Sequence, residues 1–252
     1  MSFGVCIVSI SPMRKEPSHT SEMVSQLLFG EFVEILEPQK TFTKIRCLYD
    51  DYDGWVQSSQ LDAITKLVAG FKPIGYTYKH KSKAIIKDEK LYLSVATPVY
   101  HTIPTKRFDL IYDQPMIWNS EEDLKDDYII KSIALLYINT PYLWGGKSSS
   151  GIDCSGFTQQ VMKLLNIKLK RDAYQQAEQG TAIGFLAETI CGDLAFFDNE
   201  EGRITHVGIL LTPETIIHSS GRVRIDKIDH MGIVNSDTGE RTHKLRIIKR
   251  FL

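Results

Sequence analysis

Short apolar stretches of strand character recur through residues 1–65. Residues 4–8, 32–36 and 43–48 alternate or run continuously apolar, and residues 55–56 begin a further strand after a turn at 50–54. Several short strands at this close spacing predict a small β-barrel. Residues 66–117 are again strand-like and rich in tyrosine, so we interpret them as a second, divergent barrel or as a β-rich linker.

The pattern changes to helical spacing at the start of the region 118–252. Ser120, followed by three acidic residues, has the form of a capped helix start. Apolar residues then follow at helical spacing, at Leu124, Tyr128, Ile129, Ile133 and Leu136. After a glycine- and serine-rich loop at 141–152, a second helix is predicted by the apolar stripe of Phe157, Val161, Leu164 and Leu165.

Strands return after residue 192 and continue to the end of the chain. They are predicted at 194–197, 205–211, 215–219, 223–225 and 245–251. Helices followed by a run of strands, without alternation, predict an α+β domain with an antiparallel sheet. We therefore expect an all-β domain at 1–65, the second barrel or linker at 66–117, and an α+β domain at 118–252.

Charge and composition remove several functional classes. With 30 Lys and Arg against 31 Asp and Glu, the chain has no electrostatic footprint for nucleic acid or an anionic membrane, and no apolar run is long enough to span a bilayer. Residues 1–10 do not resemble a secretory signal, so we expect a cytoplasmic protein. The cysteines at 6, 47, 154 and 191 form no CxxC pair and have no histidine at zinc-ligand spacing, so we expect no zinc site. The covalent chemistry considered below needs no metal and no organic cofactor.

Cys154 differs from the other cysteines, which we interpret as small core residues, because it stands at the first turn of the second predicted helix. Unpaired backbone N–H groups and the helix dipole favour negative charge there, and the thiolate is the nucleophilic form of cysteine. We therefore expect this position to lower the pKa of the thiol. The spacing to Phe157 places Cys154 on the side of the helix that faces the sheet.

Two strand histidines are candidates for the base that this thiol needs. His206 and His218 lie on two predicted strands joined by a turn at 212–214. If that loop has three residues centred on Thr212, the two histidines are directly opposite across the ladder and share one face. His206 would take the thiol proton, and His218 would orient it. We interpret the other histidines, at 19, 80, 101, 230 and 243, as surface residues.

Each of these residues also has an ordinary structural interpretation. A cysteine at a helix start is more often structural than catalytic, and a strand histidine is usually a half-buried core residue. Here the helix-start cysteine is flanked by serine and glycine, and two histidines follow it on neighbouring strands. That combination favours covalent catalysis over three unrelated structural roles.

The same residues resemble the signature blocks of the NlpC-type cell-wall peptidases. The blocks are Asp153-Cys154-Ser155-Gly156-Phe157, His206-Val207-Gly208-Ile209 and His218-Ser219, and segments 141–146 and 192–197 also match the pattern. The resemblance covers residues 120–252. Residues 22–31 and 53–56 are similar to the bacterial SH3-like domains that accompany one branch of the family. The resemblance implies a papain-like catalytic domain, with helices packed on an antiparallel sheet, preceded by one or two SH3-like barrels.

In function, the resemblance implies a γ-D-glutamyl-L-diamino-acid endopeptidase that acts on short murein peptides beginning with L-Ala-γ-D-Glu. Tyr142 would lie beside the nucleophile and help to stabilise the oxyanion. Asp153 and Ser155 would line the substrate site, and Asp172 would bind the free amine of L-alanine. Asp172 is also a plausible helix cap, since Gln175 follows it at capping-box spacing. The family often has serine at the position of Ala173.

The same branch uses a tyrosine and an acidic residue of the SH3-like domain to close the substrate groove, and Tyr52 and Glu22 are the candidates here. Such residues are otherwise a turn tyrosine and a solvated glutamate. A groove closed at one end would admit only short peptides with a free amino terminus, which fits the recycling of imported murein peptides. The expected partner is thus a small peptide, with no nucleic acid and no membrane, and we expect a monomer.

Three other functions stay open from the sequence. A general peptidoglycan endopeptidase would attack the intact wall. A catalytically silent protein would bind a ligand through its SH3-like domains, although the complete set of Cys154, His206 and His218 argues against it. An acyltransferase on the same fold would need an apolar lipid-binding surface, which the pattern does not indicate. The sequence does not distinguish diaminopimelate from lysine at the third position of the substrate.

Overall fold

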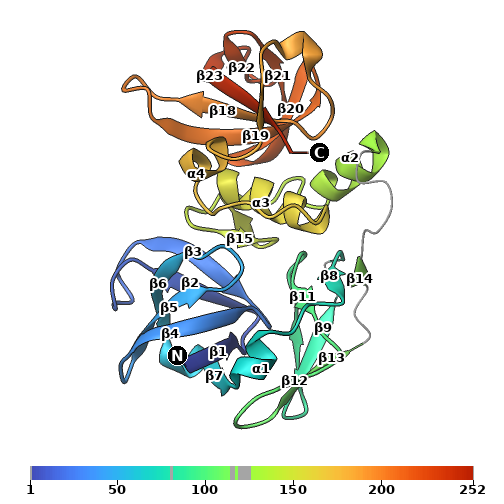
Figure 1. The fold of residues 1–252 in the computed structure, drawn as a ribbon. Helices are drawn as coiled ribbons and strands as arrows, with labels where there is room; N and C mark the ends of the chain where they lie inside the picture. The colour runs from blue at the N-terminus through green and yellow to red at the C-terminus, as the bar shows by residue number, and fades with distance from the viewer. Residues whose placement is uncertain (1, 80–81, 114–116, 119–125, 252) are drawn as a thin grey trace. The chain divides into compact units, whose positions relative to one another are not determined.

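The computed structural model of the protein describes residues 2–79, 82–113, 117–118 and 126–251. The chain forms two compact units, each built from two pieces of sequence (Figure 1). Unit 1 contains Met1–Asn119 and Trp144–Ser150, and unit 2 contains Ser120–Leu143 and Gly151–Leu252. The predicted domain 118–252 had included the segment Trp144–Ser150.

Unit 1 begins with a small antiparallel barrel, as the strand pattern predicted. Its strands are β1 (Ser2–Cys6), β2 (Ile10–Arg14), β3 (Met23–Leu28), β4 (Phe32–Pro38), β5 (Phe42–Cys47), β6 (Asp53–Gln57) and β7 (Leu61–Ile64), with the short helix η1 (Ser58–Gln60) before the last. They pair in the order β3-β2-β6-β5-β4-β1-β7. Alternate side chains turn inward and form one core, made of Cys6, Met13, Leu27, Val33, Ile45, Cys47, Val56 and Leu61.

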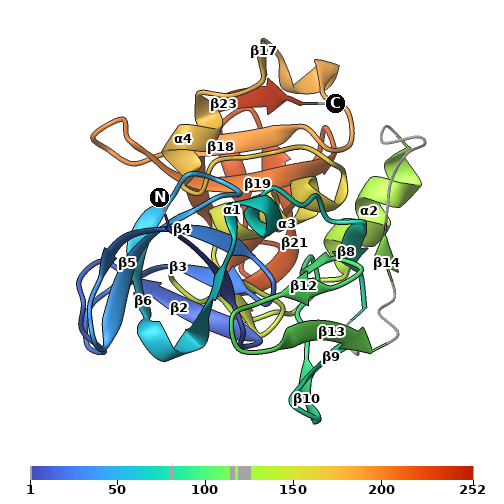
Figure 2. The same cartoon turned by 60° about the horizontal axis from the view of Figure 1, so that its bottom comes forward.

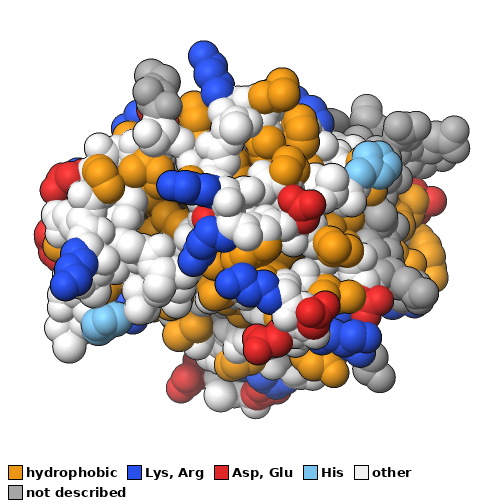
Figure 3. All heavy atoms as spheres, turned by 90° about the horizontal axis from the view of Figure 1, so that it is seen from below, with side chains coloured by type: hydrophobic (Ala, Val, Ile, Leu, Met, Phe, Trp, Pro, Cys, Tyr) orange, Lys and Arg blue, Asp and Glu red, His pale blue; other side chains and the backbone are white. Residues whose placement is uncertain are grey.

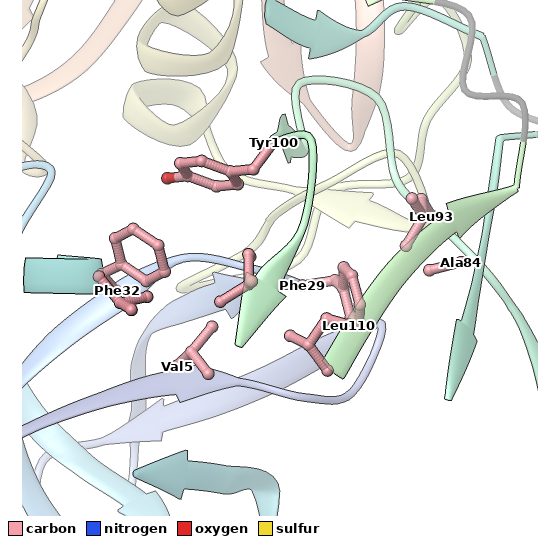
Figure 4. Packing of buried hydrophobic residues seen from close by; sticks show 9 residues of the cluster. Val5, Phe29, Phe32, Ala84, Leu93, Tyr100 and Leu110 are labelled. Atoms are coloured by element: carbon pink, nitrogen blue, oxygen red, sulfur yellow. The ribbon is translucent and has the colours of Figure 1, made fainter. Parts of the chain in front are cut away.

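The rest of unit 1 packs on this barrel through a shared core. It contains α1 (Lys66–Ala69), β8 (Gly75–Thr77), β9 (Lys83–Ile86), β10 (Glu89–Tyr92), β11 (Pro98–Val99), β12 (Ile103–Pro104), β13 (Asp109–Asp113) and β14 (Ile117–Trp118), and β15 (Lys147–Ser148) is added from the later segment. Figure 4 shows Phe29 and Phe32 of the barrel packed with Tyr100 and Leu110 from the second part. The second part therefore contributes to a core that it does not enclose alone.

The described residues of unit 2 form three α-helices and an antiparallel sheet, six strands of which close into a ring. The helices are α2 (Asp127–Leu135), α3 (Cys154–Leu164) and α4 (Ala173–Ala177). The strands are β16 (Gly151–Ile152), β17 (Thr181–Ile183), β18 (Leu194–Asp198), β19 (Ile204–Thr212), β20 (Thr215–Ser220), β21 (Arg222–Asp229), β22 (Gly232–Val234) and β23 (Arg241–Arg250), and the 3-10 helix η2 (Leu186–Glu188) lies between β17 and β18. The sheet is antiparallel in the order β17-β23-β18-β19-β20-β21-β22, and pairing of β22 with β23 closes six strands into a ring.

The long buried helix of unit 2 is α3, and every one of its residues is buried. It contacts β19 and β20, and both views show it alongside β19 (Figures 1 and 2). Some of its buried polar side chains have hydrogen-bond partners; for example, the Thr158 hydroxyl donates to Gln176 Oε1 at 2.7 Å. The apolar stripe predicted from the sequence is present, but it is only part of the buried surface of this helix.

In the described part of the chain, the first predicted helix corresponds to α2. Asp126 has extended backbone angles and accepts a hydrogen bond from the Tyr128 N–H, so α2 begins at Asp127. The predicted start at Ser120, and Leu124, lie outside the described residues. The placement of Tyr128 on the apolar stripe was wrong, because its side chain is 77% exposed and the buried face is formed by Ile130, Ile133 and Ala134.

The surface agrees with the near-zero net charge. On the face drawn in Figure 3, basic, acidic and apolar side chains are interspersed. Among the described residues, no helix is both long and apolar enough to cross a membrane.

Candidate active site

Cys154 is the first residue of α3, at the helix start that the sequence predicted. Asp153 caps this helix by accepting a hydrogen bond from the Gly156 N–H at 2.7 Å. The sulfur of Cys154 lies against the backbone on both sides of His206: it is 4.0 Å from the carbonyl oxygen of Thr205 and accepts from the N–H of Val207. The thiol is therefore held beside the strand that carries the predicted base.

That base and two further buried polar side chains form a continuous hydrogen-bonded relay. Nε2 of His206 lies 2.8 Å from Nδ1 of His218, and Nε2 of His218 lies 3.0 Å from Oδ2 of Asp226. The three residues are 6%, 1% and 2% exposed. The predicted pairing of the two histidines is thus present, and Asp226 extends it by one member.

The register that joins the histidines differs from the predicted one. Gly208, not His206, lies directly opposite His218, because the turn is a two-residue loop with Thr212 paired to Thr215 and the ladder is irregular between Leu210 and Thr212. The prediction of direct opposition was wrong. A displacement of two residues keeps both imidazoles on the same face, so they meet diagonally across the ladder.

His243 also belongs to this group, although the sequence analysis interpreted it as a surface residue. Its ring stacks on that of His206, with centroids 4.1 Å apart and planes inclined by 26°. The interpretation was wrong because β23 begins at Arg241, four residues before the predicted strand start. The alternation of His243, Leu245 and Ile247 with charged residues was the signal that could have identified it. Of the others, His19, His101 and His230 are exposed, and His80 lies outside the described residues.

Asp226 was missed for a related reason. The predicted strand 223–225 ended one residue before Asp226, but β21 extends to Asp229, and Ile225 is 40% exposed. The residues that turn toward the relay are Asp226 and its neighbour Arg224, whose Nη2 donates to Oδ1 of Asp226 at 2.8 Å. A carboxylate in an alternating stretch reads as solvent-facing, so the sequence pattern alone pointed the wrong way.

Burial decides the protonation states in this structure. It raises the pKa of Cys154 to about 12, with a further increase from Asp153, and the N–H groups of Val207 and Ser155 and the Arg171 guanidinium only partly oppose it. The expectation of a lowered thiol pKa was therefore wrong for this state, because desolvation outweighs the helix start. Burial, with His243 and His218 next, also holds the pKa of His206 well below its ordinary value. Both the Cys154 thiol and the His206 imidazole are therefore in their neutral forms.

Asp153 and Ser155, the predicted substrate-lining residues, are bound to a buried arginine that the sequence analysis did not single out. Nη2 of Arg171 lies 2.6 Å from Oδ2 of Asp153, and Nη1 donates to Oγ of Ser155 at 2.9 Å. All three side chains are buried. The arrangement fixes the start of α3, and contact of Asp153 and Ser155 with substrate stays a prediction.

Tyr142 and Asp172 lie in the segments before α3 and α4. Tyr142 pairs with Ile152, two residues before Cys154. Burial raises the pKa of Tyr142, and the charges of Cys154 and Asp153 raise it further. Asp172 precedes α4 and forms the capping box weighed from the sequence, in which its N–H donates to Oε1 of Gln175 at 3.1 Å. Its binding of a substrate amine stays a prediction. No group of three or more His, Cys, Asp or Glu in the described part of the chain is arranged to hold a metal ion.

Glu22 and Tyr52 lie in unit 1 and line one pocket there. The pocket has a volume of about 580 Å³ and also contains Lys15, Lys44 and Trp55. Oε1 of Glu22 accepts a hydrogen bond from Nε1 of Trp144 at 2.9 Å. The two residues are therefore neighbours, and their part in closing a substrate groove stays a prediction.

Comparisons with known proteins agree with this geometry. Residues 139–241 match the NlpC/P60 family, and residues 13–61 match the bacterial dipeptidyl-peptidase SH3 domain. The chain is 30% identical over 205 residues to gamma-D-glutamyl-L-lysine dipeptidyl-peptidase of Bacillus subtilis, which covers 75% of this chain and 66% of that protein. It is 27% identical over 262 residues to dipeptidyl-peptidase 6 of Lysinibacillus sphaericus, covering 90% and 92%.

A solved structure shares the whole fold. The crystal structure of an NlpC/P60 family protein from Bacillus cereus superposes with a TM-score of 0.81 at 19% identity and covers 100% of both chains. Its likeness supports the fold of both units, and the matched segments contain Cys154, His206 and His218 in the first and Glu22 and Tyr52 in the second. The chain therefore contains a catalytic domain of the NlpC/P60 cysteine peptidase family, with a bacterial dipeptidyl-peptidase SH3 domain ahead of it.

Proposed function

We propose that this protein hydrolyses the γ-D-glutamyl bond to the diamino acid in short murein peptides that have a free amino-terminal L-alanine. The observation that carries the proposal is the thiol of Cys154 held against the strand of His206, with His218 2.8 Å behind it. The printed activities of the relatives, gamma-D-glutamyl-L-lysine dipeptidyl-peptidase and dipeptidyl-peptidase 6, support the choice of bond. We further propose a papain-like catalytic arrangement, a cytoplasmic location and a role in peptide recycling.

The chemistry is acyl transfer through a thioester. His206 takes the proton of the Cys154 thiol as the sulfur attacks the γ-glutamyl carbonyl carbon, and the tetrahedral oxyanion is held by N–H groups at the start of α3 and by the Tyr142 hydroxyl. The C–N bond then breaks, and the proton passes from His206 to the leaving amine of the diamino acid. Water attacks the thioester and gives a proton to His206, the C–S bond breaks, and the proton returns to sulfur.

The neutral forms of Cys154 and His206 in the absence of substrate are compatible with this mechanism. A buried thiol with a pKa of about 12 stays protonated until a substrate is present, so the nucleophile forms together with the attack on the carbonyl. General-base assistance of this kind contributes about 10²–10⁴ in rate. The burial that opposes ionisation also protects the sulfur from solvent oxidants between turnovers.

The test is product analysis by mass spectrometry with L-Ala-γ-D-Glu-L-Lys and its diaminopimelate counterpart. Wild type should release L-Ala-γ-D-Glu, and Cys154→Ala should lower kcat by at least about 10³-fold. Cys191→Ala is the matched control: this cysteine is also buried in unit 2, but its sulfur lies against the carbonyl oxygen of Asp127. Acetylating the amino terminus of the tripeptide should abolish cleavage.

Three results would change or end the proposal. Equal turnover of the free and acetylated peptides would exclude recognition of the amino terminus. Clearing of purified sacculi at a rate comparable to tripeptide cleavage would instead identify a general peptidoglycan endopeptidase. An unchanged product pattern with Cys154→Ala would end the claim that Cys154 is the nucleophile.

A further inference from the structure

We propose that Asp226 is a positioning residue for this chemistry: it fixes the tautomers of His218 and His206, so that Nδ1 of His206 is the atom that receives the thiol proton. The inference rests on the proposed function for its kinetic consequences and on the geometry of the relay for everything else. Asp226 contacts neither the nucleophile nor the reacting bond, and it acts through the two imidazoles. Its side chain is 2% exposed, so the effect is not screened by solvent.

The carboxylate of Asp226 is bound on both oxygens by donors. Oδ2 faces Nε2 of His218 at 3.0 Å, while Oδ1 accepts from Nη2 of Arg224 and from the backbone N–H of Ser236, both at 2.8 Å. Burial alone would raise the pKa of this carboxyl, but the hydrogen bonds from His218, Ser236 and Arg224 together hold it well below its ordinary value. Asp226 is therefore ionised, and an ionised carboxylate can only accept.

The ionised state of Asp226 determines which nitrogen of each histidine carries hydrogen. Because Asp226 can only accept, Nε2 of His218 must carry hydrogen. A neutral imidazole carries one hydrogen, so Nδ1 of His218 presents a lone pair and accepts from Nε2 of His206 across 2.8 Å. Nε2 of His206 is then the protonated nitrogen, and its Nδ1 is left with a lone pair to act as the base.

The same order of bonds stabilises the ion that forms. When Nδ1 of His206 takes the thiol proton, the imidazolium donates from Nε2 to His218, which already donates to the Asp226 anion. The positive charge thus forms in a buried site with an anion two hydrogen bonds away. The reverse tautomers would instead put hydrogen on Nδ1 of His206, which could then not accept the thiol proton.

A second layer holds the carboxylate in place. Nη2 of Arg224 lies 3.0 Å from Oδ2 of Asp237 and donates to Oδ1 of Asn235 at 3.0 Å. The turn after β22 therefore closes over Asp226 with Asn235, Ser236 and Asp237. Besides its own members, the titratable and charged groups near the relay are His243, whose ring lies beside those of His206 and His218, and Arg224 with Asp237, beside Asp226.

The test compares Asp226→Asn with Asp229→Asn. Both aspartates lie on β21 and both pair with an arginine, but Asp229 binds Arg241 at 2.7 Å and is not part of the histidine relay. An asparagine amide can donate to Nε2 of His218 and invert both tautomers. Asp226→Asn should therefore lower kcat by about 10²–10⁴ with KM changed less than about twofold, whereas Asp229→Asn should change kcat less than about twofold. Asp226→Glu should recover at least about tenfold of the loss.

The direct readout is the ¹⁵N spectrum of the imidazoles without substrate, in which the protonated and bare nitrogens of each ring are distinguished. Wild type should have hydrogen on Nε2 of His206 and His218, and Asp226→Asn should move it to Nδ1 on both rings. Hydrogen on Nδ1 of His206 in wild type would overturn the proposal even if the variant fails to fold. A loss of kcat with unchanged tautomers, or equal losses in both asparagine variants, would also overturn it.

These measurements separate the two proposals. If wild type cleaves none of the murein peptides, the proposed function fails, while the nitrogen spectrum still decides whether Asp226 sets the tautomers. If the peptides are cleaved and the tautomers are the reverse of those expected, the positioning role fails and the proposed function stands.

Discussion

At the scale of single residues, the chemistry depends on side chains whose burial changes their ordinary behaviour. Cys154, His206 and His218 could be found from the sequence because a helix-start cysteine and strand histidines stand out locally. Asp226 and Arg171 could not, because their significance depends on which strand or loop lies beside them in the fold, and His243 had only the alternation along its strand to indicate an inward position. A charged or polar residue in an alternating stretch looks solvated until its neighbours are known.

The stacked position of His243 leads to a prediction about pH and stability. Burial, with His218 next, lowers the pKa of His243 from 6.5 to about 4, although Asp226 opposes this. Between those values the unfolded chain binds a proton that the folded chain does not, so stability is complete above pH 6.5 and falls as the pH drops toward 4. The depressed pKa of His206 acts in the same direction.

Replacing His243 should reduce this acid sensitivity. The melting temperature of His243→Leu should fall less between pH 7 and pH 4 than that of wild type, as measured by differential scanning calorimetry. His101→Leu is the control, because His101 is an exposed histidine of unit 1. Parallel melting curves for wild type and His243→Leu across this range would show that His243 does not supply the effect.

At the scale of elements, the site depends on how β19 and β20 are aligned. The sequence predicted both strands, the turn between them and the shared face of the histidines. It did not predict the register, because the irregularity between Leu210 and Thr212 cannot be read from residue type. Closure of the ring by pairing of β22 with β23 was likewise not predicted. Periodicity along the chain can indicate a strand, but it does not indicate which strand it pairs with.

Gly208, directly opposite His218 on the neighbouring strand, leaves room for the His218 side chain in the diagonal pair of histidines. A Cβ at this position would lie 2.8 Å from Cβ of His218 and 2.8 Å from Cδ1 of Ile216. Gly208→Ala should therefore displace His218, lower kcat by at least about tenfold and destabilise the fold by about 1–3 kcal/mol. Gly184→Ala is the control, because an added Cβ there meets nothing within 4 Å. Kinetics and urea unfolding of the two variants measure both effects, and unchanged kcat in Gly208→Ala would contradict the role given to this glycine.

At the scale of the whole molecule, the segment Trp144–Ser150 belongs to unit 1 although its flanks belong to unit 2. Its anchor is a buried ion pair: Nζ of Lys147 lies 3.2 Å from Oε2 of Glu31, with side chains 1% and 3% exposed. The Lys147 N–H also donates to Oε1 of Gln26 at 2.9 Å. The segment directly connects Leu143 to Gly151, and so lies in the chain between Tyr142 and Cys154. No local sequence pattern could predict that this segment packs in unit 1, because Lys147 and Glu31 are 116 residues apart.

Breaking the ion pair tests this anchor. Glu31→Gln removes the carboxylate and leaves the Lys147 ammonium buried beside a neutral side chain, which should destabilise the protein by about 3–5 kcal/mol in urea unfolding. We also expect a severalfold lower kcat, because the loosened segment leads directly to the start of α3. Glu37→Gln, at an exposed position of β4, should change neither quantity. Equal stabilities of the two variants would contradict a structural role for the pair.

The two-piece construction of each unit has a consequence for how the protein is made. The ribosome delivers the barrel strands of unit 1 early, with the Glu31 carboxylate in place, but the lysine that neutralises it is synthesised only 116 residues later. The amino-terminal unit therefore cannot reach its final packing while it is the only part of the chain outside the ribosome, even though such units commonly fold first. Unit 1 can therefore complete its packing only after the segment Trp144–Ser150 has been synthesised, when part of unit 2 has also left the ribosome.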